Sequence, residues 1–491
     1  MEEGLLVKER LSRRWGEIRE EMKRLGHIAG PMVAVNLSFY LLQVILLMMV
    51  GHLGELSLSG TAIALSLAGV TGFSLLVFSS LSKSHLFYFW HFGNGSALET
   101  ISGQAFGAKQ YEKIGTQTYT AIASLILVCI PVSLLWAKVE YLLKLAGQDP
   151  HISHEAGKMV MWLIPTLFAY AFLQPLIRYY QMQSLIRPLL VSSCITLCFH
   201  VPLCWALVYK SGLDNVGGAV AMDLSMWLNV SILSLYMKYS PHCLKTRSSI
   251  SMEIVRGMGV FFKFAIPSAT MICLQWWSFE LMILLSGLFP HPQLEASVLS
   301  VCLNTVETLY AVPYGLASAA STRISNQLGA GRPQGARLSL IALLLLAAVN
   351  AFVVSLAIFL SRNVFGYAFS NEKEVVDYVT RMAPLVCLSI VADCVQGVLS
   401  GVARGCGWQH IGAYINLAAF YLFGLPIAAV LGFWLDLRGK GLWIGVVCGS
   451  TLQCVMLSVI TALTDWEKQA LEARGRCFHE EVVNDVGDNR L

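Results

Sequence analysis

The sequence has little charge. Only 13% of its 491 residues are Asp, Glu, Lys or Arg, whereas 56% are hydrophobic. An ordinary soluble domain carries roughly 25% charged residues. This chain therefore has too few charges to cover a surface that faces water, which excludes an ordinary soluble enzyme. The net charge is only +4, and no run rich in Lys and Arg is interleaved with aromatic residues, so nucleic acid is not expected as a partner.

Motifs for metal binding, nucleotide hydrolysis and covalent catalysis are also lacking. The thirteen cysteines are scattered mostly through apolar runs without a CxxC pair, which indicates buried free thiols rather than a zinc site or a disulfide framework. No GxxxxGKS or GxxxxGKT loop occurs, so nothing supports ATP hydrolysis. His and acidic residues are too dispersed to form a nucleophile with its base or a metal cluster. We expect no enzyme activity, catalytic residues, metal or cofactor.

Long apolar runs dominate the chain instead. They cover residues 27–50, 56–78, 116–137, 156–177, 188–209, 215–237, 258–288, 295–320, 336–360, 376–400, 409–434 and 441–463. A helix that spans the bilayer needs about 20 apolar residues, and runs of this length are too long for strands. The sequence therefore predicts an all-α polytopic membrane protein with twelve transmembrane helices.

The basic residues indicate how the chain is oriented. Residues 1–26 hold seven Lys/Arg and six Glu, which makes them too polar for a signal peptide. We expect them to form a cytosolic tail with a short amphipathic helix. Most of the Lys and Arg residues lie in the two tails and in the loops after even-numbered spans. Because cytosolic loops are rich in Lys and Arg, both termini should be cytosolic.

The first six spans and the last six follow one plan. Pro31 in AGPMVAV aligns with Pro267 in AIPSATM at an offset of 236 residues. SALETISGQAFGA, after span 2, and SAASTRISNQLGA, after span 8, place Gly107 opposite Gly329 at an offset of 222. Two pseudo-symmetric six-helix lobes, related by an axis along the membrane normal, are therefore expected. The predicted parts are an N-terminal tail (1–26), an N-lobe (27–237), a cytosolic linker (238–257), a C-lobe (258–463) and a cytosolic C-terminal tail (464–491).

The two offsets differ by 14 residues, which indicates an insertion in the first half. The segment FSSLSKSHLFYFWHF (78–92) has no counterpart in the second half, and it contains Lys83, His85 and His91. It could be a loop that grips a substrate or senses pH through its histidines. Alternatively, it is a splice-variant or gene-model relic that adds a bulge at the cytosolic end of span 2. We favour the relic and assign no chemistry to these histidines.

Several motifs, in this order along the chain, carry a resemblance to a known family. HLGELSLSGTAIALSLAGVTGFSLL, SALETISGQAFGAKQY, WWSFELMILLSGL, ASTRISNQLGAG and DCVQGVLSGVARGCGWQ resemble the plant branch of the multidrug and toxic compound extrusion (MATE) family, the DETOXIFICATION proteins. The resemblance covers about residues 27–463 apart from the insertion. It implies twelve helices in two lobes around a central cavity that opens alternately to the two sides of the membrane.

The resemblance also implies a function. The leading hypothesis is a proton-coupled antiporter that exports organic cations or secondary metabolites of the alkaloid, flavonoid or xenobiotic class from the cytosol. The expected partners are a small organic substrate, protons and the lipid bilayer; the expected state is a monomer in the vacuolar or plasma membrane. One alternative is a transport-impaired splice isoform. Another is a flippase of the same wider fold, which would favour a strongly cationic cavity.

Acidic residues at membrane depth are the candidates for proton coupling, because a charge in the bilayer is costly unless it faces a cavity. Asp393 lies in the middle of span 10 and matches the aspartate that the resembled family uses in its C-lobe cavity. A low dielectric favours the neutral form of a carboxyl group, so Asp393 could take up a proton on the acidic side and release it to the cytosol. Glu280 in span 7 and Glu307 in span 8 are further candidates. For all three, a hydrogen bond that holds helices together is the alternative.

The chain departs from the family pattern at two positions. In span 7 the family usually has a glutamate before two aromatic residues, whereas this chain has Gln275, which cannot carry a proton. Glu280 follows five residues later and points about 140° away around the helix, so it does not simply replace the missing acid. In the first repeat, Phe39 stands opposite Gln275 where the plant pattern usually has glutamine. Gln174 aligns with Asp393, which indicates coupling by acids of the C-lobe alone.

Polar and aromatic side chains near these positions are candidates for a substrate cavity, because flat or cationic molecules bind by stacking and cation–π contact. The predicted cavity residues are Gln275, Trp276, Trp277, Tyr310, Tyr314, Asn36, Asn304 and Gln174. Aromatic residues in membrane helices also serve packing and interface belts, and this alternative stays open. Pro31, Pro267 and Pro313 each remove a backbone hydrogen bond and are predicted to bend the helices for rocking of the lobes. Bent helices also occur without such a role.

Two further ionisable residues receive structural interpretations. His200 in LCFHVPLCW is a lone histidine on an apolar face, and we expect its ring to be satisfied by a structural hydrogen bond. Asp223 lies near the outer third of span 6, where we expect it to be hydrated.

Overall fold

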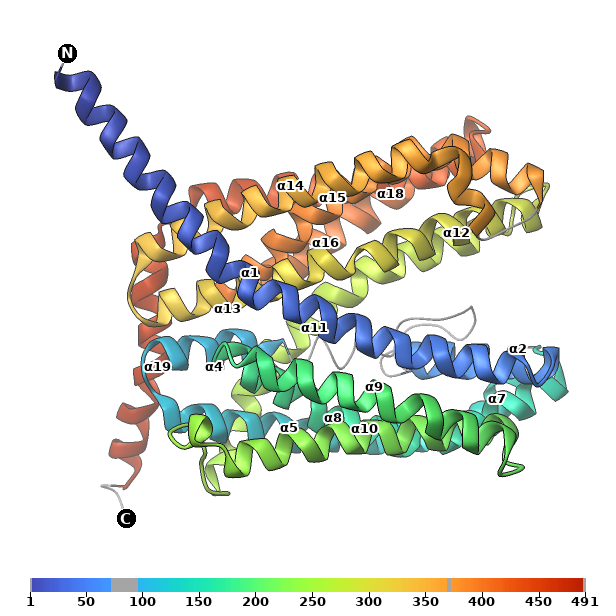
Figure 1. Ribbon diagram of the computed structural model, residues 1–491, viewed down its shortest axis with the longest axis horizontal. Coiled ribbons are helices and arrows are strands. Elements are labelled where there is room, and N and C mark those ends of the chain that lie inside the picture. Colours follow the sequence, from blue (N-terminus) through green and yellow to red (C-terminus); the bar gives the residue numbers. More distant parts are fainter. Residues whose placement is uncertain (1, 72–95, 146, 369–371, 489–491) are drawn as a thin grey trace. The chain divides into compact units, whose positions relative to one another are not determined.

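All regular structure in the described part of the chain is helical (Figure 1). The computed structural model describes residues 2–71, 96–145, 147–368 and 372–488, so the predicted insertion lies outside the described residues. Within this part, nine helices are long and apolar enough to cross a membrane, and a bent helix pair adds a tenth span if it is counted as one. Backbone polar groups in a bilayer must pair within the protein, which a helix achieves internally. The prediction of an all-α polytopic membrane fold is confirmed.

Contacts divide the chain into two compact units. Unit 1 comprises Met1–Val33, Gly103–Lys109 and Leu274–Leu491, and unit 2 comprises Ala34–Ser102 and Gln110–Cys273. Three helices contribute residues to both units: α1 (Glu2–Gly51), α4 (Ala97–Gly107) and α11 (Glu253–Ser286). The lobe and linker boundaries that the repeat predicts stay a prediction.

Unit 2 is a helical bundle in which α8 occupies a central place. Helix α8 covers Ile164–Met182, and the other elements that lie wholly in this unit are α2 (Glu55–Thr71), α5 (Tyr111–Trp136), α6 (Val139–Leu145), α7 (Pro150–Trp162), α9 (Ile186–Tyr209), α10 (Asp214–Tyr239) and the short η2 (Pro241–Cys243). Helix α8 packs against α5 and α10, α10 also packs against α9, and α2 packs against α7. Much of α8 is therefore buried, including its polar side chains.

A buried ion pair fixes the start of α4 against α8. Oε1 of Glu99 lies 2.9 Å from a terminal guanidinium nitrogen of Arg178, and these side chains are only 1% and 2% exposed. Arg178 also donates to Oε1 of Gln181 on the next turn of α8. Loss of one partner from such a pair leaves an uncompensated charge in a low dielectric.

Replacement of Arg178 by alanine is expected to lower the free energy of unfolding by about 3–5 kcal/mol, because Glu99 would stay buried without a cation. Lys144 and Glu140 provide the matched control, since this pair has a distance of 2.6 Å but is 44% and 36% exposed. Lys144→Ala is expected to cost at most about 1 kcal/mol. Denaturant unfolding of the purified proteins in detergent measures both effects, and equal losses would contradict this ranking.

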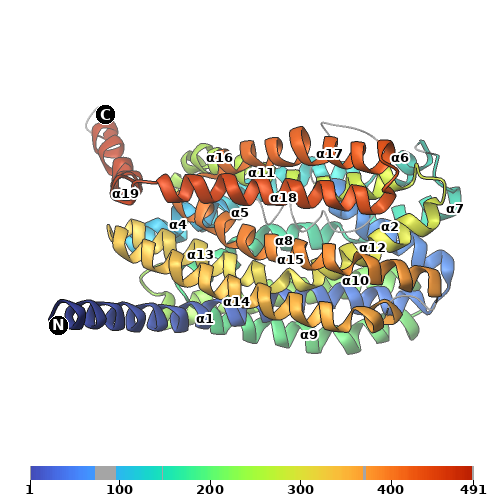
Figure 2. The same ribbon diagram turned by 90° about the horizontal axis from the view of Figure 1, so that it is seen from above.

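Unit 1 is arranged around α15 (Lys373–Cys406). Helix α15 packs against α12, α13, α14 and α18, and Figure 2 shows α16, α17 and α18 together along one face of this unit. The remaining bounds are α12 (Pro292–Leu309), α13 (Ala311–Gly329), α14 (Pro333–Phe365), η3 (Gly366–Ala368), α16 (Gln409–Asn416), η4 (Leu417–Gly424), α17 (Leu425–Ala429), η5 (Val430–Trp434), α18 (Arg438–Leu463) and α19 (Trp466–Asp488).

Close packing of α15 on α13 depends on small residues. A Cβ atom at Gly401 would lie 2.3 Å from the carbonyl oxygen of Ala317, a backbone atom that cannot rotate away. Gly397 and Gly405 lie one turn before and one turn after it and also face α13. Small residues at this spacing let two membrane helices approach closely. The three glycines hold α13 against one face of α15, and this face begins one turn after Asp393.

The last turn of α4 crosses the last turn of α13 at two glycines that the repeat makes equivalent. A Cβ atom at Gly107 would lie 2.1 Å from the carbonyl oxygen of Asn326, and one at Gly329 would lie 2.0 Å from that of Gln104. Gln104 and Asn326 also correspond at the offset of 222. The contact is therefore reciprocal, and it requires glycine at both positions because only glycine allows backbones to approach so closely.

The predicted N-terminal tail is not a short separate helix, because it forms one continuous helix, α1, with the first span. Glu21 ties it into unit 1. Its Oε1 accepts from Nε of Arg323 at 2.8 Å and from Oγ of Ser339 at 2.7 Å, while its Oε2 accepts from a terminal nitrogen of Arg323 at 2.9 Å. These bonds attach the tail to α13 and α14.

The predicted C-terminal tail contains a docked helix, α19. The residues of α19 that are buried lie three or four positions apart and form one face: Trp466, Ala470, Ala473 and Cys477. On this helix Arg476 donates to Oε1 of Gln104 at 3.1 Å and to the carbonyl oxygen of Cys406 at 3.0 Å. Helix α19 therefore joins the last turn of α4 to the end of α15.

Two of the predicted bending prolines, Pro31 and Pro267, lie inside the continuous helices α1 and α11. Pro313 lies in the first turn of α13, directly after the break that separates α12 from α13. A further break, of 44°, separates α7 from α8 and precedes Pro165, which the repeat does not single out. The role of the three predicted prolines in lobe movement stays a prediction.

Candidate functional site

A chain of polar side chains links three elements of unit 1. Gln396 on α15 donates through Nε2 to Oε1 of Gln275 on α11 and to Oγ of Ser400, both at 2.8 Å. The hydroxyl group of Tyr310, between α12 and α13, donates to Oε1 of Gln396 at 3.4 Å. The amide oxygen of Gln275, a predicted cavity residue, is therefore bonded to Gln396. We call Gln275, Tyr310, Gln396 and Ser400 the Gln396 network.

Asp393 lies one turn before Gln396 on α15. Its side chain is 4% exposed, and its carboxyl group interacts electrostatically with the hydroxyl group of Tyr310. The guanidinium group of Arg404 also acts on Tyr310. The charge of Asp393 is therefore felt by a member of the Gln396 network. A buried carboxyl group with such a neighbour is a candidate for a functional titrating group.

The charges of Glu280 and Glu307 interact. Their carboxyl groups, on α11 and α12, are close enough to repel each other electrostatically, and both side chains are partly buried. Two carboxylates that share a site cannot both be charged without cost. Glu280 points to a different side of α11 from Gln275. It therefore interacts with Glu307, whereas Gln275 bonds Gln396. Asp393 and the Glu280–Glu307 pair are therefore two separate candidates for proton binding in unit 1.

An aromatic cluster adjoins the Gln396 network. The rings of Trp276 and Tyr310 meet edge to face, with centroids 5.9 Å apart and an angle of 89° between planes. The ring of Phe279 lies 6.2 Å from that of Trp276. Tyr310 therefore belongs to both groups, since its ring packs on Trp276 while its hydroxyl group bonds Gln396.

The other predicted cavity residues of the C-lobe differ in their surroundings. Trp277 and Tyr314 are partly buried on α11 and α13. Asn304 donates to Oγ of Ser300 at 3.4 Å, one turn away on the same helix α12. Contact of these three residues with a substrate stays a prediction.

Unit 2 holds the predicted polar residues of the N-lobe, Gln174 and Asn36. Gln174 is 1% exposed, and its Oε1 has no hydrogen-bond partner among the described residues. The same is true of Oγ1 of Thr196 on α9 and of both amide atoms of Asn229 on α10. Asn36 is partly buried on α1. Thr196 and Asn229 are missed by sequence reasoning, because a single polar residue in an apolar run gives no sign of which way it faces.

Neighbouring hydroxyl groups bond His200 and Asp223, the two ionisable residues for which the sequence predicts structural roles. Nδ1 of His200 lies 2.9 Å from Oγ of Ser225, whereas its Nε2 has no hydrogen-bond partner among the described residues, so the expected satisfaction of the ring is met at one nitrogen only. The expectation that Asp223 is hydrated is wrong, because its side chain is 7% exposed and its Oδ1 accepts from the hydroxyl group of Thr166. We assign neither residue to transport.

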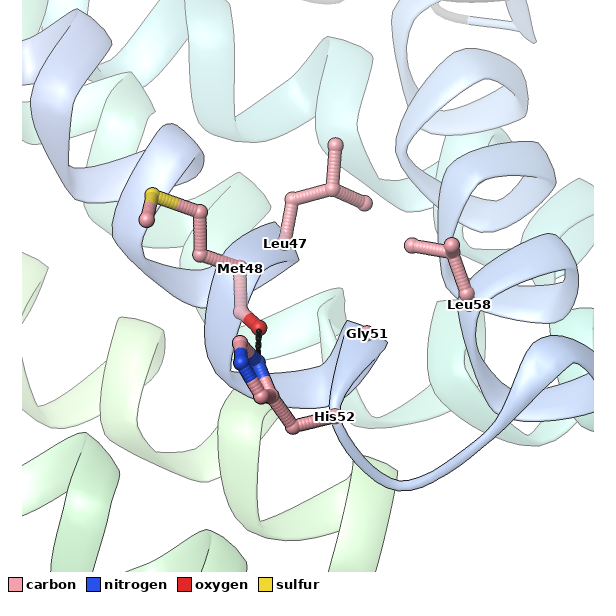
Figure 3. Close-up of a pocket in the computed structure, with 5 residues that line it drawn as sticks. All are labelled: Leu47, Met48, Gly51, His52 and Leu58. Atoms are coloured by element: carbon pink, nitrogen blue, oxygen red, sulfur yellow. Dashed lines mark hydrogen bonds between the residues drawn. The ribbon is translucent and has the colours of Figure 1, made fainter.

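A surface hollow of about 360 Å³ lies at the corner between α1 and α2 (Figure 3). It is lined by Leu47, Met48, Gly51, His52 and Leu58. Nδ1 of His52 lies 2.7 Å from the carbonyl oxygen of Met48, so the ring is bonded within its own helix. The lining is largely apolar and includes none of the predicted cavity residues. We assign no substrate to this hollow.

Comparisons with known proteins decide the family. The family model MatE matches residues 79–206 and 267–430, which are more than half of the chain. The chain belongs to the MATE family. Among its MATE relatives, DETOXIFICATION 12 of Arabidopsis thaliana is 55% identical over 467 residues, 94% of each chain. DETOXIFICATION 14 of the same plant is 55% identical over 483 residues, 98% of this chain and 96% of the relative.

Solved structures agree with this assignment. The crystal structure of the eukaryotic MATE transporter AtDTX14 matches 94% of this chain and 100% of its own, with 55% identity and a TM-score of 0.87. The MATE transporter VcmN of Vibrio cholerae, in its bent form, has the same fold at 15% identity, with a TM-score of 0.75. The chain thus has the MATE fold, in which twelve helices form two six-helix lobes.

The MATE assignment fixes the class of activity. Members of this family are transporters, so this chain is a multi-pass membrane transporter and not an enzyme. In the described ranges, no three His, Cys, Asp or Glu side chains are grouped so that they could hold a metal ion.

Proposed function

We propose that this MATE protein is a proton-coupled antiporter that exports organic cations or secondary metabolites from the cytosol by alternating access. The observation that carries the proposal is the presence of three acidic side chains on helices of unit 1: Asp393 on the spanning helix α15, Glu280 on the spanning helix α11 and Glu307 on α12. Acids at membrane depth are costly and mark ion and proton pathways. The alkaloid, flavonoid and xenobiotic classes are the proposed substrates.

Asp393 is the proposed coupling residue, because its charge acts on the hydrogen bonds around it. When Asp393 is ionised, its field acts on the Tyr310 hydroxyl group, which donates to Gln396. Gln396 in turn holds Gln275 on α11. Binding of a proton to Asp393 thus changes the electrostatic balance of a network that joins α11, α12 and α15. We propose that this change in the hydrogen bonds between the helices couples proton binding to helix movement.

The Glu280–Glu307 pair is the proposed second proton-binding centre. Both carboxyl groups repel each other when charged, and one proton bound to the pair relieves this repulsion. A cationic substrate would relieve it as well. Proton and substrate would then compete for one centre, which is the requirement for exchange.

The proposed substrate surface combines this negative charge with the aromatic cluster of Trp276 and Tyr310. An aromatic face attracts an organic cation, and a nearby carboxylate adds to that attraction.

We propose further that the transporter acts as a monomer, that both termini face the cytosol, and that it resides in the vacuolar or plasma membrane.

Transport into liposomes tests this proposal. The full-length protein is reconstituted, and uptake of a fluorescent quaternary ammonium compound is followed with an acidic or a neutral lumen. A quaternary cation is used because it cannot be trapped passively by protonation. The acidic lumen is expected to accelerate uptake, since protons leaving the lumen drive the cation inward. Uptake at the same rate under both conditions, or equal uptake by protein-free liposomes, would refute proton coupling.

One observation favours a second candidate, the transport-impaired isoform. Gln275 stands where the family usually has an acid, and its amide is bonded to Gln396. Two variants separate the candidates in the same assay: Gln275→Glu, and deletion of residues 78–92. An impaired isoform requires that the unmodified chain be inactive and that one of these changes restore gradient-driven uptake. Uptake by the unmodified chain excludes it.

A further inference from the structure

Residues 238–263 of unit 2, which comprise the end of α10, the connection to α11 and the first turns of α11, concentrate positive charge. The basic residues of this segment are Lys238, Lys245, Arg247, Arg256 and Lys263, and its one acidic residue is Glu253. The resulting charge of +4 equals the net charge of the whole chain. We call these residues the basic linker.

Most of this charge is available at the surface. Arg247 serves the linker itself, because its guanidinium group donates to the carbonyl oxygens of Lys238 and Ser240. The side chains of Lys238, Lys245, Arg256 and Lys263 are exposed, and none of them forms an ion pair with another residue in the part of the chain that the structure describes. Four cations therefore remain without a protein counter-ion there.

Large apolar side chains are exposed beside these cations. Leu244 is 68% exposed, Ile250 84%, Met252 73% and Val255 57%. Residues 247–251 form no helix, so this exposure is not simply that of a spanning helix facing lipid tails. Exposed apolar and basic side chains that alternate in this way are typical of a segment that lies in the membrane interface.

Buried contacts fix the conformation of the basic linker, and this conformation exposes its apolar side chains. Thr246 is 3% exposed, and its Oγ1 lies 2.5 Å from the hydroxyl group of Tyr179 and 3.0 Å from Oε1 of Gln183. Cys243 is fully buried, and Gly115 approaches the carbonyl oxygen of Thr246 so closely that a Cβ atom would lie 2.5 Å from it. These anchors turn Leu244, Lys245 and Ile250 outward.

The ends of the flanking helices place the linker at the level of the lipid headgroups. Helix α11 has 34 residues and is therefore about 51 Å long at about 1.5 Å per residue. The hydrocarbon core of a bilayer is only about 30 Å thick. Three of the four charged residues of α11, Glu253, Arg256 and Lys263, lie in its first eleven positions, which favours this end, with residues 240–252 before it, as the part that reaches beyond the core.

We propose that the basic linker binds anionic lipid headgroups of the leaflet that it faces. The phosphate groups of anionic lipids supply the counter-ions of Lys238, Lys245, Arg256 and Lys263, while the exposed apolar side chains enter the boundary between headgroups and acyl chains. The apolar side chains favour a lipid over an acidic protein, which could neutralise the cations but would leave Ile250 and Met252 in water. The proposal is independent of proton coupling, because it concerns lipid binding and requires no transport.

Spin-labelled lipids test the proposal on the full-length protein. In phosphatidylcholine liposomes, the relative association of spin-labelled phosphatidylglycerol and phosphatidylcholine with the protein is measured by electron spin resonance. We expect a preference for phosphatidylglycerol that falls as salt is raised. In the double variant Lys245→Gln/Arg256→Gln, the preference is expected to fall by about tenfold, because each surface cation contributes several-fold to the binding of an anionic lipid.

Two controls make the result specific. Arg332→Gln/Arg337→Gln removes two exposed cations at the start of α14, where no large apolar side chain of residues 326–348 is exposed, and it should leave the preference unchanged. Ile250→Ser/Met252→Ser should weaken association with both lipids and keep the salt dependence. A preference that is insensitive to salt, or that falls equally in the Arg332/Arg337 variant, overturns the proposal.

Discussion

Gly329→Ala is expected to lower the free energy of unfolding by about 3 kcal/mol or more, because the added Cβ atom would lie 2.0 Å from the carbonyl oxygen of Gln104. The clash is with backbone, so relief requires that α4 and α13 move apart. Such a separation would also strain the bonds that Arg476 makes to Gln104 and Cys406. Thermal unfolding in detergent, together with recovery of monodisperse protein, measures the loss.

The repeat supplies a second substitution, and α1 supplies a matched control. Gly107→Ala meets the carbonyl oxygen of Asn326 at 2.1 Å and should cause a similar loss. The double variant should lose less than the sum, since both changes open the same crossing. Gly26, also in a helix, has nothing within 4 Å of a built Cβ atom, so Gly26→Ala should be neutral or stabilise by up to about 1 kcal/mol. If Gly329→Ala is as stable as Gly26→Ala, the close crossing does not exist.

Asp393→Asn is expected to abolish the part of transport that depends on a pH gradient, reducing it to the rate of protein-free liposomes. The amide keeps the size of the side chain and its capacity for hydrogen bonds but cannot bind and release a proton. Uptake of the quaternary cation with an acidic and a neutral lumen gives the gradient-dependent part by difference. Binding of the same cation, measured separately by fluorescence, should persist.

Asp223→Asn is the matched control for this result. Asp223 is also an acid on a spanning helix, but it lies in unit 2 and bonds the hydroxyl group of Thr166. An asparagine can keep a hydrogen bond to that hydroxyl group, so gradient-driven uptake should stay near the wild-type rate. If Asp223→Asn abolishes gradient-driven uptake while Asp393→Asn preserves it, the coupling residue has been misassigned.

The fold and the acidic residues could be predicted from sequence because both depend on composition along the chain. A run of about 20 apolar residues has few structures available in a bilayer other than a helix. An acid within such a run is conspicuous, which is how Asp393, Glu280 and Glu307 were found. The repeat was visible because equivalent glycines such as Gly107 and Gly329 stand in equivalent motifs.

The partners of these residues could not be predicted, since they depend on helix rotation and tilt. Gln396 lies three residues after Asp393 and is as visible in the sequence as Gln275, but nothing in the sequence indicates that the two amides bond each other. The meeting of Glu280 with Glu307 depends in the same way on how α11 and α12 are turned.

The docking of the two terminal helices could not be predicted for a different reason. The tails are rich in charge, which is typical of cytosolic extensions, although the spacing of Trp466, Ala470, Ala473 and Cys477 already marks an apolar face in the second tail. Glu21 gave no such signal, because its partners Arg323 and Ser339 are some 300 residues away in the sequence.

The central claim is that protons and an organic cation move in opposite directions through one protein, and counterflow measures this most directly. Proteoliposomes are loaded with the quaternary cation and a pH-sensitive dye, clamped electrically with potassium and valinomycin, and diluted into cation-free buffer at the same pH. If the claim is correct, the lumen becomes acidic as the cation leaves, and Asp393→Asn shows no acidification. Exit of the cation at the full rate with no change in lumenal pH would contradict proton antiport.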